Sequence, residues 1–113
     1  MAAVYVSNIV INQGADFSQI FNLADSSNDK IDLTDFTLSA QMRKHAGSSV
    51  SVNLNPTVAQ PSTNGSVRIT LTDAQTSTLK PGRYVYDILI ADNFGVKTRV
   101  VEGSAIVREG VTR

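Results

Sequence analysis

The amino-acid sequence predicts an all-β fold: a sandwich of two antiparallel sheets with about seven strands and one short helical turn. Apolar and polar side chains alternate along much of the chain, as they do in strands with one buried face. Turn-forming residues separate these runs at intervals of roughly ten residues. One stretch, residues 72–80, breaks the alternation. A small barrel remains the alternative, because patterning does not separate it from a sandwich.

The first two expected strands cover residues 4–11 and 16–24, with the sequences VYVSNIVI and DFSQIFNLA. Their alternation is irregular, but they hold the β-branched and aromatic residues that strands favour. The turn between them contains Gly14, for which we expect a positive φ. The sequence therefore predicts that the chain opens with two strands joined by a short turn.

Three further strands are expected at residues 37–45, 50–54 and 66–72. The clearest alternation is in SVRITLT, where Val67, Ile69 and Leu71 share one face. Pro56 and Pro61 bracket a segment that cannot be a central strand, because proline lacks the N–H that a ladder needs.

A short helical turn is expected in TDAQTSTLK, with Asp73 as the candidate cap. It should end before Pro81, and Pro81 with Gly82 suits a type II turn. The next strand, residues 82–91, is expected to be central because both of its faces are largely apolar. Tyr84 follows the turn as a tyrosine does at the corner of Ig-like sandwiches, where its hydroxyl bonds to backbone upstream.

The last expected strand is residues 96–107, after a turn that contains Gly95. Gly103 is interpreted as a bulge at which the two faces of the strand exchange. Lys97 and Arg99 are expected to pair across the hairpin with Asp87 or Asp92, in the manner of exposed ion pairs. Residues 108–113 are polar and are expected to form an exposed tail.

Length and charge suggest one domain over residues 1–113, without nucleic acid or membrane partners. Ten basic residues balance ten acidic ones, so there is no global field to attract DNA or RNA. The start has no basic region followed by a long apolar run, and no window is apolar enough to span a bilayer. The chain contains no cysteine, which fits synthesis in a reducing cytoplasm.

Neither catalysis nor a cofactor is expected. His45 is the single histidine and is interpreted as an exposed loop residue, because nothing beside it matches a nucleophile motif. One polar loop holds oxygen ligands that could suit calcium: Asp25, Asn28, Asp29, Asp32 and Asp35. Their spacing does not match an EF-hand loop, so we expect ordinary side-chain turns and no bound metal.

Four segments, in this order, resemble small virion proteins of tailed bacteriophages: INQGADFSQIFNL, IDLTDFTLSAQMRK, ITLTDAQTSTLKPGRYVYDILI and GVKTRVVEGSAIVREGVTR. Such proteins often carry a Gly-Asp-Phe start, a turn of the form dLTg and an ending that begins PGrYvYD. Here Ala15 interrupts the first motif, and Asp35 stands where glycine is usual. The resemblance implies an Ig-like sandwich located in the virion, as part of a tail, baseplate or neck, and implies no catalytic residues.

The expected partners are other virion proteins, with multiple copies or a homo-oligomer on the particle. The expected contact surfaces are the end strands and the basic C-terminal region. The candidate residues are Val4, Tyr5, Val6, Lys97, Arg99, Arg108 and Arg113. Two alternatives stay open: a decoration protein on the capsid surface, and a carbohydrate- or receptor-binding module of the tail.

Overall fold

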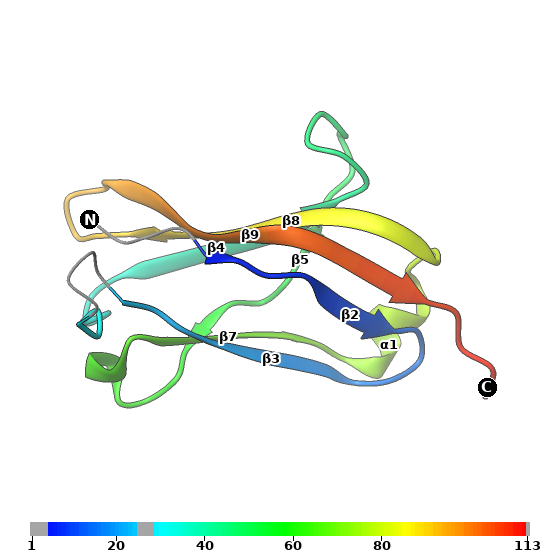
Figure 1. Cartoon of the computed structure of the whole chain (residues 1–113), viewed down its shortest axis with the longest axis horizontal. Helices are drawn as coiled ribbons and strands as arrows, with labels where there is room; N and C mark the ends of the chain where they lie inside the picture. The colour runs from blue at the N-terminus through cyan, green and yellow to red at the C-terminus, as the bar shows by residue number, and fades with distance from the viewer. Residues whose placement is uncertain (1–4, 25–28, 113) are drawn as a thin grey trace.

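The computed structural model describes residues 5–24 and 29–112. These residues form an Ig-like sandwich, in which a larger and a smaller sheet lie one above the other (Figure 1). The elements in chain order are β1 Tyr5–Val6, β2 Ile9–Asn12, β3 Phe17–Asn22, β4 Thr37–Arg43, β5 Val52–Asn53, β6 Thr57–Val58, the 3₁₀ turn η1 Ser62–Asn64, β7 Ser66–Leu71, α1 Asp73–Ser77, β8 Gly82–Ala91 and β9 Lys97–Arg108.

The larger sheet has the order β1-β9-β8-β4-β5, and β2 also pairs with β9. Its centre is antiparallel, as the sequence predicted, and β8 is a central strand. The smaller sheet has the order β3-β7-β6 and is antiparallel throughout. The short strand β6 lies in the segment between Pro56 and Pro61 and takes an edge position, as the prolines require.

The described chain has nine strands, where the sequence predicted about seven. One addition is β6, and the other arises because the first expected strand is divided into β1 and β2. Both halves pair with β9 in parallel, with Tyr5 opposite Val101 and Ile9 opposite Ala105. The paired residues are separated by the same number of positions in both halves, so the register does not change between them. The division arises because Ser7 and Asn8 leave the strand conformation locally.

The helical turn α1 begins one residue earlier than the sequence suggested, because its cap is Thr72 and not Asp73. The Thr72 hydroxyl accepts the Gln75 N–H, and the Gln75 side chain accepts the Thr72 N–H, which satisfies both groups reciprocally. Inside the turn, the buried Thr76 hydroxyl accepts the Gly14 N–H and donates to the Ala15 carbonyl. These bonds attach α1 to the turn between β2 and β3.

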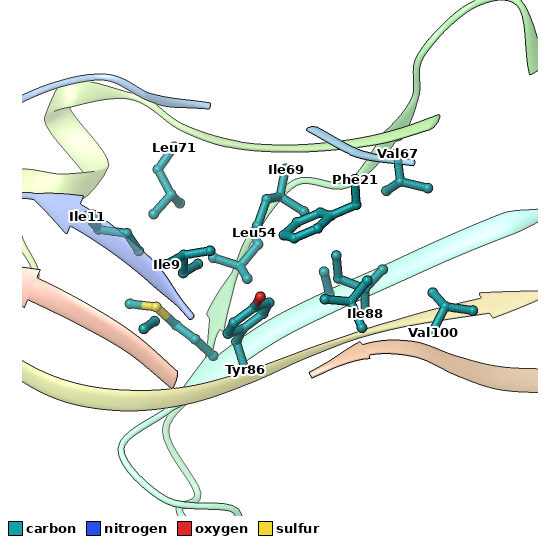
Figure 2. Close-up of a cluster of buried hydrophobic side chains, with 14 of the residues drawn as sticks. Ile9, Ile11, Phe21, Leu54, Val67, Ile69, Leu71, Tyr86, Ile88 and Val100 are labelled. Atoms are coloured by element: carbon teal, nitrogen blue, oxygen red, sulfur yellow. The ribbon is translucent and has the colours of Figure 1, made fainter. Parts of the chain in front are cut away.

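The core fills the space between the two sheets. Figure 2 shows Phe21 and Ile69 of the smaller sheet facing Ile88 of the larger one, with the Tyr86 hydroxyl pointing into the layer. Phe21 and Tyr86 are in contact at 6.5 Å between ring centroids. In antibody domains a disulfide joins the two sheets. This chain has no cysteine, and the Phe21–Tyr86 contact is one of the contacts that connect its two sheets.

The bulge in β9 lies at Val100 and not at Gly103. Ile88 is opposite Val101 and Leu89 is opposite Arg99, so Val100 is the additional residue. The bulge turns both Val100 and Val101 into the core, where each is fully buried. The predicted exchange of faces is therefore real, but it occurs three residues earlier.

Candidate interaction surfaces

Gly103 lies where the N-terminal segment crosses β9, a feature that we call the N-terminal crossing (Ser7, Tyr86 and Gly103). A Cβ on Gly103 would overlap the carbonyl oxygen of Ser7, so glycine provides the space for this approach. The Ser7 N–H donates to the Glu102 carbonyl at 2.9 Å, and the Tyr86 hydroxyl donates to the Ser7 carbonyl at 2.5 Å. Burial raises the pKa of the Tyr86 hydroxyl above its ordinary value near 10.

On its outer face the larger sheet carries a shallow depression of about 720 Å³, which we call the outer hollow. Its apolar lining comes from Val6 of β1 with Val85 and Leu89 of β8. One wall is formed by His45 and Ala46 of the arm, the loop of residues 44–51 that stands away from the sheet (Figure 1). The arm is held at its base by Arg43, whose guanidinium donates to the Ser48 carbonyl.

Charges of both signs line the outer hollow. Arg99 lies 3.3 Å from Asp87 and 3.8 Å from Glu102, so two carboxylates share one guanidinium. Arg43, across the hollow, donates to the neutral oxygens of Gln41 and Ser48. All three members of the Arg99 cluster are more than one-third exposed, so the cluster adds little to stability and remains accessible to a partner.

A second surface is the open side of the sandwich, formed by the outer edges of β2 and β3. In the described chain, β2 pairs with β9 alone and β3 pairs with β7 alone, and residues 13–16 join the two strands. The Gln13 N–H donates to the Arg108 carbonyl of β9. Because successive residues of a strand direct their backbone groups to opposite sides, the N–H groups of Val10 and Asn12 point away from β9.

The corner at Tyr84 has the hydrogen bond that the sequence suggested. The Tyr84 hydroxyl donates to the Lys80 carbonyl four residues upstream at 2.8 Å, and the ring is half-buried beneath the Lys44 ammonium group. The type II turn at Pro81 and Gly82 is wrong, because Gly82 has a φ of +142° and not about +80°. Gly82 is instead the first residue of β8, in a conformation that other residues rarely adopt.

The predicted contact residues are distributed over both ends of the larger sheet. Val6 and Arg99 meet at the outer hollow, and Arg99 makes the expected pair with Asp87. Tyr5 is on β1, and the exposed Lys97 begins β9. Arg108 is exposed but ends β9 opposite Asn12, so the expected tail starts one residue later. Residues 109–112 are exposed apart from the half-buried Gly110, whose N–H donates to the Gln13 side chain. Val4 and Arg113 lie outside the described residues.

The described part of the acidic loop behaves as a set of local turns. Asp32 accepts hydrogen bonds from both the hydroxyl and the N–H of Thr34, which hold the pKa of its carboxyl below the ordinary value. Asp25 and Asn28 fall outside the described residues. Within residues 5–24 and 29–112, no three His, Cys, Asp or Glu side chains are grouped to hold a metal ion.

His45 is exposed on the arm. The described helices include none long and apolar enough to cross a membrane.

The outer hollow was not predicted from the sequence. It combines β1, β9, β8, β4 and the arm, and these segments become neighbours only through sheet order and register. Its one available signal was the outward row Val85, Asp87 and Leu89 in a strand expected to be central. The outer edge of β3 was also missed, because nothing in its sequence shows that β2 pairs elsewhere.

No family model matches this chain, and no curated protein matches it. Among solved structures, a mutant of the SrpA adhesin from Streptococcus sanguinis is similar with a TM-score of 0.51 and 13% identity, over 96% of this chain and 57% of the adhesin chain. An internalin-like protein, lmo2027, of Listeria monocytogenes gives 0.45 at 12% identity, over 95% and 28% of the two chains. A family 123 glycoside hydrolase from Clostridium perfringens gives 0.48 at 14% identity, over 98% and 24%.

These structural similarities concern the fold. The chain spans just over half of the adhesin chain and about a quarter of the other two. At such identities a shared sandwich says nothing of a shared activity. The adhesin similarity agrees with an Ig-like arrangement of the two sheets.

Proposed function

We propose that this chain is a structural protein of a bacteriophage particle, a small sandwich module that docks on other proteins of the tail, baseplate or neck. The order of the four sequence segments supports the phage origin. The observation that carries the docking role is the open side, where one edge of each sheet is available over β2 and β3. A capsid-surface position would use the same surface.

The open side suits a partner that adds a strand. Outward N–H and C=O groups of an edge strand provide a template for main-chain pairing. Val10 on β2 and Ile20 on β3 are 50% and 43% exposed, so a strand laid along either edge also gains apolar contact. Affinity would come from backbone bonds, and specificity from these side chains.

A protein partner fits these surfaces better than a carbohydrate does. Sugar sites usually stack an aromatic ring on the apolar face of the sugar. Tyr86 is the aromatic residue in the described lining of the outer hollow, but its ring points into the layer between the two sheets and is 4% exposed. Phe94 and Tyr5 are more exposed, but Phe94 lies on a turn and Tyr5 on β1, and neither residue belongs to that lining.

The experiment places charges on the open side. In phage produced with the variant Val10→Lys/Ile20→Lys, the protein should be absent from purified particles while its melting temperature stays near that of the parent. Val50→Lys, a 73% exposed position on the arm, is the matched control and should incorporate normally. The proposal fails if the parent protein is not found in purified particles, or if the double variant incorporates as well as the control.

A further inference from the structure

The turn between β8 and β9 presents an aromatic side chain on a fixed backbone. In this Phe94 turn, residues 92–96, the Asp92 carboxylate accepts the N–H groups of Phe94 and Val96 at 2.9 and 3.0 Å. The Gly95 N–H donates to the Asp92 carbonyl, and the Asp92 N–H to the Val96 carbonyl. The turn is therefore ordered before any partner arrives, which lowers the entropy cost of binding through it.

Phe94 and Val96 are nevertheless 86% and 61% exposed. An exposed phenylalanine makes no contribution to the core, and its exposure is unfavourable in water. Aromatic side chains of this kind, held on a rigid element, are typical anchors of protein interfaces when they enter an apolar pocket.

The outer hollow has the size and the lining to receive such an anchor. It is an open depression of about 720 Å³, and Val6, Val85 and Leu89 provide aliphatic surface against which an aromatic ring can pack. The hollow and the Phe94 turn lie at different places on the same larger sheet. One copy can therefore offer its turn while its own hollow stays free for another copy.

The charges beside the two features are complementary. Arg99 lies nearer to Asp87 than to Glu102, at 3.3 against 3.8 Å, so Glu102 is the less compensated carboxylate, and Arg43 is across the hollow from it. Lys97 is an exposed cation directly after the turn. Opposite charges at the rim of an interface orient the partners and raise the association rate.

We propose that the outer hollow binds the Phe94 turn of a second copy of this chain, with Lys97 of the incoming copy facing Glu102. Because the two surfaces differ, the contact is heterologous, and repetition gives a ring or an open chain of copies. This inference does not depend on the virion assignment. Its failure would leave docking through the open side untouched.

The test uses two variants that remove opposite halves of the contact. Phe94→Ala removes the anchor and keeps the hollow, whereas Val85→Arg fills the hollow and keeps the anchor. In sedimentation of the purified protein up to about 1 mM, a range in which small transient interfaces associate, the parent should form concentration-dependent oligomers. Each variant alone should remain monomeric with a melting temperature near that of the parent.

An equimolar mixture of the two variants should form a dimer that does not grow further, because one intact hollow meets one intact anchor. Ile20→Lys, on the open side, is the control and should associate like the parent. A parent that stays monomeric, variants that associate like the parent, or a mixture that stays monomeric would each overturn the proposal.

Charge reversal tests the orientation. Glu102→Lys should weaken association roughly fivefold, the upper range for an exposed ion pair. Adding Lys97→Glu to that variant should restore the parent affinity, because the pair is re-formed with its signs exchanged. A double variant that associates no better than Glu102→Lys alone would overturn the proposed orientation.

Discussion

The N-terminal crossing and the Phe94 turn are both held by hydrogen bonds around a glycine, but they are built in opposite ways. At the crossing, Tyr86 and Ser7 are 79 residues apart, and Gly103 is needed for space. In the Phe94 turn the partners are at most four residues apart, and Gly95, with a φ of +84° and open surroundings, is needed for conformation. We therefore expect the stability of the fold to depend on the N-terminal crossing, whereas the Phe94 turn exposes its side chains to solvent.

The largest effect is expected from Gly103→Ala. The new methyl group would overlap the Ser7 backbone, which cannot move without disturbing β1 and β2, so we expect a loss of about 3 kcal/mol in the free energy of unfolding. Gly95→Ala is the control in the other region and should cost about 1 kcal/mol, from backbone strain alone. Urea denaturation of both variants measures the difference, and equal losses would contradict the account of the crossing.

The second prediction removes the long-range hydrogen bond. Tyr86→Phe keeps the ring in the core but leaves the Ser7 carbonyl without its donor, so we expect a loss of about 1–3 kcal/mol. Tyr84→Phe, which loses a more exposed bond to Lys80, should cost less. A Tyr86→Phe variant as stable as the parent would show that the crossing does not depend on this hydroxyl.

The same tyrosine predicts a pH dependence. Burial raises the pKa of folded Tyr86 above its unfolded value near 10, so its contribution is fully present below pH 10 and is lost as the pH rises through the folded pKa. Between about pH 9 and about pH 11, the parent should therefore lose more stability than Tyr86→Phe does. Parallel unfolding curves for the two proteins over that range would contradict the assignment.

A smaller effect is expected from Asp92→Ala in the Phe94 turn. The carboxylate accepts two backbone N–H groups, but water can replace it at this exposed site, so we expect a loss of about 1 kcal/mol. The change should appear as faster amide exchange at Phe94 and Val96, with exchange in the core unaltered. Loss of protection throughout both sheets would mean that the turn supports the fold after all.

The smallest effect is expected from Phe94→Ala. A side chain that is 86% exposed should change the free energy of unfolding by no more than about 0.5 kcal/mol. Thermal unfolding of the variant at a dilution where the parent is monomeric provides the measurement. A destabilisation comparable to that of Tyr86→Phe would show that the ring has a structural contact in the folded chain.

The sequence predicted those features that depend on neighbouring residues. Alternation located the strands, and the Tyr84 hydroxyl bonds four residues upstream, within the reach of local reasoning. The Phe94 turn was expected from Gly95 for the same reason. In each of these cases, the residues that make the interaction are close together in the chain.

Features that depend on sheet order and register could not be predicted from the sequence. The parallel pairing of β2 with β9 joins residues 96 positions apart, so no local signal marks it. Gly103 was interpreted as a bulge because a glycine in a strand has two common explanations, a bulge or a close backbone approach, and the approaching Ser7 is distant in sequence. The true bulge, at Val100, has no glycine to mark it.

The most direct test of the proposed docking role is a map of an intact phage particle at a resolution that separates strands. The account predicts this sandwich in the tail, baseplate or neck, with the outer edge of β2 or β3 against another protein subunit and Val10 or Ile20 covered by it. A particle that lacks the chain, or a map in which the whole open side faces solvent, would contradict that role.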